Sequence, residues 1–297
     1  MIPYRRVTPA GPWGPVQDAW AGAGRVVVYG AAEAWATDAL TALSAEETAR
    51  VRAQRSAAAR GRFLASRRLL RHTVGTLLAV PWTGVRLART PLGRPVLPDR
   101  PDIGISLSHT GGLLAVAVSA LGPVGVDTER AGRPTGPELA GRVCAPGELL
   151  HLAGLPARDH ADAVLRLWTL KEAYVKALGT GLRVSLRGIG FDAIGGPSPS
   201  GPRGWSFTTR EVRVYIDGDA GDAGGAGTSY HVSAAHLTSA HATAARTAWS
   251  RTIPAPTAPA PAPVPALADR PGDTAAGRAG NTAAGRRLSS RSAAGSS

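Results

Sequence analysis

The chain changes character at Pro254, and this change limits how much of it can fold. From Pro254 to Ser297 proline alternates with alanine, and the sequence then becomes rich in Ala, Gly, Ser and Arg without a single aromatic residue. A segment with so few large apolar side chains cannot bury enough surface to offset the entropy lost on ordering. We therefore expect a disordered tail over 254–297 and a folded body over 1–253.

The folded body has the residue patterns of an α+β (mixed α/β) protein. Strand patterns occupy Arg25–Tyr29, Ile103–Ser108, Leu113–Ser119, Val124–Glu129, Glu211–Ile216 and Tyr230–Ala235. Helical patterns occupy Ala45–Thr76 with a break at Gly61, Glu138–Arg142 and Asp162–Leu178. Ser44 followed three residues later by Glu47 is a typical start of a helix. The glycine-rich stretch 217–227 is predicted to connect the last two strands.

The two long helical patterns repeat each other weakly. Ser-Ala-Glu-Glu at 44–47 precedes a basic helix that ends at Gly75, and Cys-Ala-Pro-Gly-Glu at 144–148 precedes a helix that ends at Gly179. Glycine is a common residue just after a helix. The repetition suggests two related halves, which we place at 1–122 and 123–253, with a ligand site at their junction.

The chain is strongly basic, with a formal net charge of +13 and a pI near 11.2. Such a charge favours an acidic partner, which can be a nucleic acid, a phosphorylated ligand or an acidic protein surface. The arginine bias of the whole composition is an equally good explanation of the excess. Lysine occurs only at Lys171 and Lys176. We interpret this pair as an indication that this segment needs the compact ammonium group of lysine rather than a guanidinium group.

Cysteine usage and the N-terminus indicate the compartment. Cys144 is the single cysteine, so neither an intramolecular disulfide nor a cysteine-rich zinc site can form. The first residues lack the pattern of a signal peptide, and no apolar run is long enough to span a membrane. We expect a cytoplasmic protein that does not interact with membranes.

Asp127 and Glu129 lie two apart on a predicted strand, and their side chains therefore share one face. Two neighbouring carboxylates repel each other unless a cation lies between them. Oxygen ligands without histidine or cysteine suit a hard ion such as Mg²⁺. The alternative at this stage is a solvent-facing strand end with two ordinary acidic residues.

The helix at 162–178 contains a second group of polar residues. Spacing by four places Trp168, Glu172 and Lys176 on one face, so that Glu172 is a candidate third carboxylate and Lys176 a candidate phosphate contact. Lys171 is one position away and is predicted to reach another part of a phosphorylated ligand. An amphipathic surface helix with a Glu–Lys pair remains the alternative.

Ser108 and His109 stand at the end of a predicted strand, before Gly111 and Gly112. A hydroxyl, an imidazole and free backbone N–H groups favour phosphate binding there. A serine hydrolase is disfavoured, because Ser108 is not in a Gly-x-Ser-x-Gly turn. The arginines of the first half suit phosphate as well, although most of them are expected to be solvated surface. They are Arg50, Arg52, Arg55, Arg60, Arg62, Arg67, Arg68, Arg71 and Arg94.

Taken together, these motifs resemble the Sfp-type 4′-phosphopantetheinyl transferases over about residues 44–191. The order is the helix start at Ser44, Gly-Arg-Pro at 93–95, Ser-His at 108–109, Gly-x-Asp-x-Glu at 125–129, Trp-x-x-Lys-Glu-x-x-x-Lys at 168–176 and Gly-x-Gly at 179–181. This chain departs from the family pattern in three ways. Ser106 stands where Asn is common, Arg94 stands where Lys is common, and Thr180 replaces a Lys between two glycines.

The resemblance implies a pseudo-dimer of two similar α/β subdomains that works as a monomer. It implies transfer of the phosphopantetheine arm of coenzyme A to a serine of an apo acyl or peptidyl carrier protein, with Mg²⁺ as cofactor. Asp127, Glu129 and Glu172 match the magnesium ligands, and Glu172 is also the candidate base. The catalytic set is Glu172, Lys176 and His109, and the implied contacts of coenzyme A are Arg50, Arg62, Arg94, Ser108, His109 and Lys176. Among these, Arg62 and Arg94 match the basic residues that hold the adenosine 3′-phosphate and nearby groups.

Two other functions stay open from the sequence. A magnesium-dependent hydrolase of coenzyme A or nucleotides would use the same site with water as the nucleophile. A basic nucleic-acid-binding protein would explain the charge, but the chain has no recognisable nucleic-acid module, and its aromatic residues are not interleaved with its basic ones. We therefore expect acidic carrier proteins, rather than nucleic acid, as partners.

Overall fold

A computed structural model describes residues 1–38, 42–192, 201–215, 227–238 and 240–241. All of them belong to one compact unit, Met1–Ala258. The predicted tail at 254–297 and nearly all of the predicted connection at 217–227 lie outside the described residues. Among the described residues, no helix is long and apolar enough to cross a lipid bilayer.

The first half builds a four-stranded sheet in the order β1-β2-β6-β5. Its strands are β1 (Tyr4–Arg6), β2 (Arg25–Ala31), β5 (Gly104–Thr110) and β6 (Leu113–Ser119). β1 runs parallel to β2 and the other pairs are antiparallel. The hairpin between β5 and β6 turns at two glycines, of which Gly111 has a φ of 55°, a conformation that costs glycine little. This turn ends β5 directly after the Ser108–His109 pair.

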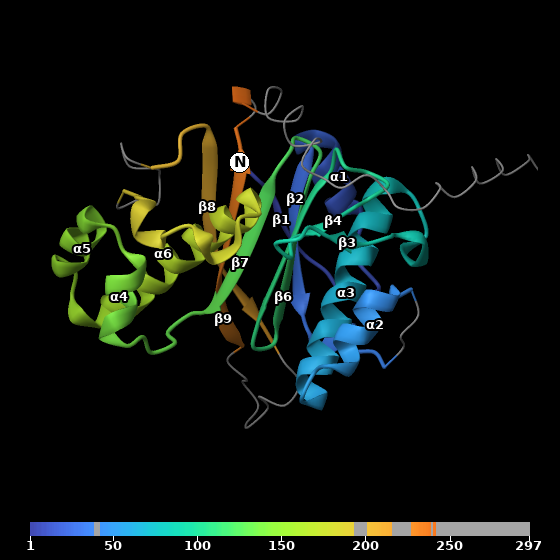
Figure 1. Ribbon diagram of the computed structural model, residues 1–297, viewed down its shortest axis with the longest axis horizontal. Coiled ribbons are helices and arrows are strands. Elements are labelled where there is room, and N and C mark those ends of the chain that lie inside the picture. The colour runs from blue at the N-terminus through green and yellow to red at the C-terminus, as the bar shows by residue number, and fades with distance from the viewer. Residues whose placement is uncertain (39–41, 193–200, 216–226, 239, 242–297) are drawn as a thin grey trace, which may run out of the picture. The chain divides into compact units, whose positions relative to one another are not determined.

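Helices cover the outer face of this sheet (Figure 1). They are α1 (Gly14–Ala23) and α3 (Ala57–Leu78), and α2 (Ala45–Arg52) packs against α3. Leu69, Leu70 and Val74 of α3 pack in one buried cluster with strand residues such as Val26 and Val116. Full burial of a side chain of this size stabilises the fold by about 1.5–3 kcal/mol. The apolar side of this helix formed by Leu69, Leu70 and Val74 therefore faces the sheet.

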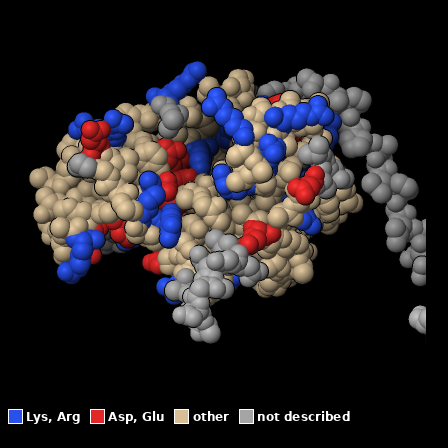
Figure 2. Space-filling view, turned by 90° about the horizontal axis from the view of Figure 1, so that it is seen from below, with Lys and Arg blue, Asp and Glu red and all other residues tan. Residues whose placement is uncertain are grey.

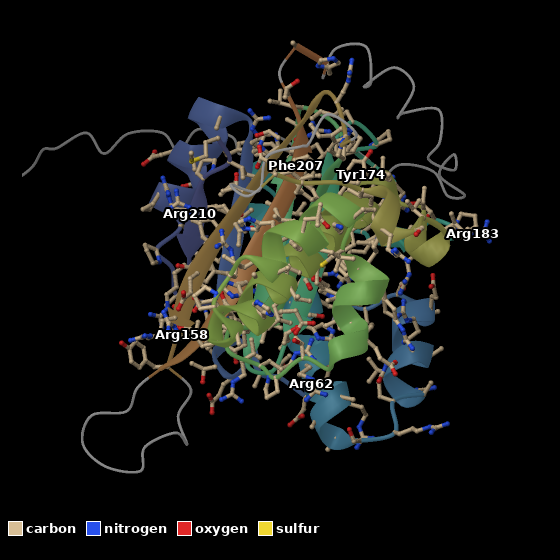
Figure 3. All side chains as sticks on the ribbon, turned by 90° about the vertical axis from the view of Figure 1, so that its left-hand side faces the viewer. Arg62, Arg158, Tyr174, Arg183, Phe207 and Arg210 are labelled. Carbon is tan, nitrogen blue, oxygen red and sulfur yellow. The ribbon has the colours of Figure 1, made fainter. Side chains whose placement is uncertain are left out.

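The second half builds an antiparallel sheet in the order β7-β9-β8. Its elements are β7 (Val124–Arg130), α4 (Pro137–Val143), α5 (Pro146–Ala153), α6 (Ala157–Leu178), β8 (Trp205–Val214) and β9 (Thr228–Leu237). α6 packs on the outer face of the sheet, where Tyr174 contacts Phe207 edge to face at 5.8 Å between ring centroids (Figure 3). A Cβ added at Gly125 would collide with the backbone of α6, so β7 and α6 lie close together there.

The inner faces of the two sheets share one apolar cluster. Val27 and Ala115 of the first sheet belong to it together with Val126 and Val232 of the second. Seen in Figure 1, the helices α3 and α6 lie on opposite sides of the paired sheets. Short elements complete the fold: β3 (Ala88–Arg89), β4 (Pro95–Val96), and 3₁₀ turns at Glu33–Trp35, Trp82–Gly84, Gly181–Arg183 and Leu186–Gly188.

The two halves repeat a local design, as expected for a pseudo-dimer. α3 and α6 have 22 residues each, and a short helix precedes each of them. The third residue of each short helix is a buried glutamate, Glu47 or Glu148, which bonds back to its own helix start. Each of these glutamates also pairs with a buried cation on the long helix, Arg71 or Lys171.

The predicted helix break was placed at the wrong residue. Gly61 lies inside α3, and the first helical segment ends at Arg52 instead. Ser56 starts the next helix, because its hydroxyl accepts a hydrogen bond from Ala59 N at 3.1 Å. A glycine within a helix costs only about 1 kcal/mol, which the packing of α3 offsets. The short helices α1 and α5 were not predicted, and α6 begins five residues before the predicted start at Asp162.

Candidate active site

A pocket of about 610 Å³ opens where β5, β7 and α6 meet, with α2 and α3 at its other wall. The predicted residues that line it are Arg50, Arg94, Ser108, His109, Asp127, Glu129, Trp168, Glu172 and Lys176. The helical spacing of Trp168, Glu172 and Lys176 and the shared strand of Asp127 and Glu129 therefore bring these side chains together as predicted. Figure 2 shows acidic and basic side chains gathered side by side near a hollow on one face of the molecule.

Lys176, Asp127 and Ser108 form a compact polar group in this pocket. Lys176 Nζ donates to Asp127 Oδ1 at 2.6 Å and to Ser108 Oγ at 3.0 Å, and the Ser108 hydroxyl donates to Asp127 Oδ1 at 2.8 Å. Ser108 and Asp127 are buried, whereas the Lys176 side chain keeps 32% of its surface exposed. The ammonium is therefore held at the pocket floor and still faces the pocket.

Side-chain hydrogen bonds join β5 to β7, two strands that belong to different sheets. Ser106 Oγ accepts a hydrogen bond from Val126 N at 3.1 Å, and Thr110 Oγ1 donates to Thr128 O at 2.6 Å. These two bonds flank Ser108 along β5. Ser106 thus has a positional role at the point where the chain departs from the family pattern.

Glu172 is a half-buried carboxylate with one buried, unused oxygen atom. Its Oε1 atom has no hydrogen-bond partner among the described residues. Burial, followed by the nearby charge of Asp127, raises the pKa of Glu172, and Lys176 opposes this effect. The pKa of Glu129 is also raised, mainly by burial, although Arg133 forms an ion pair with it at 3.3 Å. A carboxylate with a raised pKa is a better proton acceptor than an exposed one.

The three carboxylates face one pocket without forming a closed metal cluster. Among the described residues, no three His, Cys, Asp or Glu side chains lie close enough together to hold a metal ion. Asp127 instead uses Oδ1 for Lys176 and Ser108. The donor set still fits a hard cation, because it consists of oxygens and because Glu172 Oε1 is buried without a partner.

Basic residues also line the pocket. His109 keeps an exposed edge, and the loss of water around its ring, then the charges of Lys176, Arg62 and Arg67, lower its pKa. Arg94 is largely buried and donates from NH1 to Ala177 O at 3.3 Å, near the C-terminal end of α6. A cation is favourable at that end of a helix.

Two family models match consecutive parts of the chain. The model described as 4′-phosphopantetheinyl transferase, N-terminal, matches residues 30–121, and the model described as 4′-phosphopantetheinyl transferase superfamily matches residues 123–217. The chain belongs to the 4′-phosphopantetheinyl transferase superfamily. The predicted resemblance and mixed α/β fold are confirmed by these matches.

The relatives that this chain resembles carry consistent names. The 4′-phosphopantetheinyl transferase HetI of Nostoc sp. is 36% identical over 150 residues, which are 49% of this chain and 63% of the relative. The 4′-phosphopantetheinyl transferase psf-1 of Bacillus pumilus is 31% identical over 140 residues, 45% and 59% of the two chains. The human L-aminoadipate-semialdehyde dehydrogenase-phosphopantetheinyl transferase is 28% identical over 175 residues, 52% and 53% of the two chains. The matched region thus spans between half and two thirds of each relative.

One predicted ligand contact, that of Lys171, is wrong. Lys171 has no exposed surface and does not line the pocket. It donates to Val143 O at 2.6 Å and pairs with Glu148 beneath α5. Lys171 is one residue away from the face of Glu172, and a rotation of about 100° per residue turns it into the helix-packed side of α6. Its isolation among arginines therefore reflects a buried structural pair rather than a ligand contact.

Three arginines differ from the expected assignment. Arg62, labelled in Figure 3, is not among the residues that line the pocket, although its charge acts on His109. Arg67 and Arg89 do line the pocket and were not among the predicted site residues. Arg67 and Arg68 are neighbours in α3. The sequence shows that both are basic residues of this helix, but it does not show which of the two faces the pocket.

Proposed function

We propose that this protein transfers the 4′-phosphopantetheine arm of coenzyme A to a serine of an apo acyl or peptidyl carrier protein, leaving adenosine 3′,5′-bisphosphate. The observation that supports it most is the meeting of Lys176, Asp127 and Ser108 in one pocket with the half-desolvated Glu172. The pocket offers cations for phosphates and a carboxylate for a proton. Both are needed for phosphoryl transfer to a hydroxyl group.

Asp127, Glu129 and Glu172 are the residues that would hold Mg²⁺, an ion that neutralises charge on pyrophosphate oxygens when it is bound. The chain's own residues do the remaining work. Lys176 turns its ammonium from Asp127 toward the pyrophosphate and offsets the negative charge that grows on the leaving group. Ser108 and His109 orient phosphate oxygens from the end of β5.

Glu172 accepts the proton of the carrier serine. Its raised pKa makes it a stronger base than an exposed glutamate, and its unused Oε1 atom is free to receive the proton. The serine oxygen then forms a bond to the β-phosphorus of coenzyme A. The bond from that phosphorus to the oxygen bridging to the adenosine nucleotide breaks, and the electron pair leaves with adenosine 3′,5′-bisphosphate.

The partner and the organisation of the chain follow from the same proposal. A net charge of +13 would steer an acidic carrier protein to the pocket, and this attraction should weaken as salt rises. Residues 1–122 provide Arg50 and Ser108 and residues 123–253 provide Asp127 and Lys176, so one chain carries every proposed residue and a monomer is sufficient. We expect this work to take place in the cytoplasm.

The test is the intact mass of an apo carrier protein after incubation with this protein, coenzyme A and Mg²⁺. We expect a gain of one phosphopantetheine that is absent with EDTA and with Glu172→Ala. Glu138→Ala is the matched control, because Glu138 is highly exposed and does not line the pocket. Cleavage of coenzyme A without any carrier modification would support the hydrolase instead. No modification of fatty-acid, polyketide and nonribosomal-peptide carriers, with coenzyme A intact, would refute a general transferase.

A further inference from the structure

A second cavity, of about 560 Å³, lies along α6, and none of the described residues lines both this cavity and the active-site pocket. Its α6 residues recur at spacings of three and four, from Asp159 through Ala163 to Leu170, and therefore share one face of the helix. Trp168 and Glu172 occupy the opposite face, toward the active-site pocket. The other wall belongs to α5, which Figure 1 shows at the opposite end of the molecule from α2 and α3. The second cavity is thus a separate place of similar size.

The floor of the second cavity is apolar. Leu167, Leu170 and Phe191 are buried members of one hydrophobic cluster, and the partly buried Leu155 packs against them. Pockets for small molecules usually have volumes of about 300–1,000 Å³ and mostly apolar walls. The second cavity therefore suits a small ligand with an apolar body.

The polar side chains of the second cavity are mostly acidic, although the whole chain has a net charge of +13. Four carboxylates and one arginine line the cavity, and one of these carboxylates, Glu148, is already neutralised by the buried Lys171. The active-site pocket, in contrast, is lined by three carboxylates, four arginines and a lysine. The other charged residues of the second cavity are Asp159, Asp162, Asp192 and Arg166.

Two of these aspartates can still accept a further partner. Asp162 Oδ1 accepts a hydrogen bond from His231 Nε2 at 2.6 Å, whereas Asp162 Oδ2 makes no hydrogen bond to a described residue. Among the described residues, the Asp159 carboxylate has only an ion pair at 3.7 Å with Arg158, whose side chain is 82% exposed. An exposed pair of this kind contributes little free energy. Both carboxylates are therefore available to a cation that enters the cavity.

We infer that the second cavity binds a small organic cation, with an ammonium or guanidinium group on an aromatic or branched alkyl body. Asp159 and Asp162 hold the charged group through charge-assisted hydrogen bonds. Leu167 and Phe191 contact the apolar body and remove it from water. The inference is independent of the proposed transfer reaction, because the ligand does not enter the active-site pocket.

Two other classes of ligand fit the second cavity less well. An anion would be repelled, because the carboxylates outnumber the single arginine, Arg166. A bare metal ion would lack ligands, because no three His, Cys, Asp or Glu side chains in the described part of the chain lie close enough together to hold one. An organic cation uses both the acidic side chains and the apolar floor.

The first experiment measures binding of a probe to the full chain. Calorimetric titration compares phenethylamine, whose ammonium group is charged at neutral pH, with phenethyl alcohol, a neutral molecule of similar shape. We expect saturable binding of the amine with a Kd of about 0.1–1 mM. The alcohol should bind at least about tenfold more weakly, because it lacks the charge that the carboxylates hold. An excess of coenzyme A should leave binding of the amine unchanged.

The second experiment locates the binding with three single variants. Ala163→Phe fills the cavity from α6 and should abolish binding of the amine. Asp159→Asn should weaken binding by about twofold to fivefold, and Arg166→Gln should strengthen it by about the same factor, since each removes one charge at an exposed position. Glu138→Gln is the matched control, because this exposed carboxylate lines neither pocket. The two charge variants keep the test decisive if Ala163→Phe does not fold.

Four results would overturn the inference. Phenethylamine could show no saturable binding, or the amine and the alcohol could bind equally well, which would show that the cavity does not select a cation. Displacement of the amine by coenzyme A would place the amine in the active-site pocket. The same change of Kd in Glu138→Gln as in Asp159→Asn would show a general effect of charge rather than a contact in this cavity.

Discussion

Lys176 Nζ lies 2.6 Å from Asp127 Oδ1 and 3.0 Å from Ser108 Oγ, so a cation from α6 joins a carboxylate of β7 to a hydroxyl of β5. The contact ties the two sheets together at the proposed reaction centre. It also places the ammonium beside an acid that is proposed to bind a cation. The pair is therefore expected to rearrange when substrate enters.

Replacement of Lys176 by Met should reduce kcat/KM for carrier modification by about a hundredfold to a thousandfold, because one charged donor to the transition state is removed. The reduction should lie mainly in kcat. Arg183→Met is the control, since Arg183 is an exposed residue just beyond α6 (Figure 3). Steady-state kinetics with one carrier protein provides the measurement. If kcat/KM of Lys176→Met lies within threefold of that of the parent protein, Lys176 is not a catalytic residue.

Lys171→Met should destabilise the fold by about 3–5 kcal/mol, because Glu148 would remain as a buried charge without its cation. The double variant Lys171→Met, Glu148→Gln should recover part of that loss, since it removes both charges. Urea unfolding of the three proteins, followed by tryptophan fluorescence, gives the comparison. If Lys171→Met is as stable as the parent protein but does not bind coenzyme A, Lys171 contacts the ligand after all.

Stability should fall between pH 7 and pH 5 because of His236. Burial lowers the pKa of this histidine to about 4, although its Nδ1 atom lies 2.9 Å from the carbonyl oxygen of Leu237; the nearby charge of Arg25, whose NH1 is also 2.9 Å from Nδ1, lowers it further. The unfolded chain, with a histidine pKa near 6.5, binds the proton first as pH falls, so protonation favours unfolding from about pH 6.5 down to about pH 4. The expected loss at pH 5 is about 2 kcal/mol.

Urea unfolding at the two pH values tests this dependence. His236→Gln should be less stable at pH 7 and should show a smaller difference between the two pH values. His151→Gln, at an exposed position of α5, should behave like the parent protein. A difference that survives in His236→Gln would assign the pH dependence to other groups.

Two glycine-to-alanine variants should act in opposite directions. Gly125→Ala would push a Cβ into the backbone of α6 at Ala173 and should cost about 1–3 kcal/mol or more, with loss of transfer as β7 and α6 move apart. Gly61→Ala has open space around it and lies inside α3, so it should stabilise the protein by about 0.5–1 kcal/mol. Thermal unfolding and carrier modification of both variants provide the measurement. Equal effects would contradict the close approach of β7 and α6.

Local patterns in the sequence determined the elements and most of the site. Short strand patterns, one of them beside a glycine turn, predicted the strands that carry Ser108 and Asp127, and spacing by four placed Glu172 and Lys176 on one helix face. These relationships depend only on backbone periodicity, which is the same in every helix and strand. For that reason they could be read before any tertiary contact was known.

Tertiary structure decided which charged residues face the pocket. Lys171 and Lys176 look alike in sequence, yet one is buried against Glu148 and the other faces the site. Arg67 and Arg68 are adjacent, and only Arg67 lines the pocket. A charged side chain can be buried only where packing places an oppositely charged partner beside it, because an unpaired buried charge costs too much free energy. The partner of Lys171 is Glu148 on α5 and that of Arg67 is Glu47 on α2, each on another helix and far away in sequence, so no local pattern identifies it.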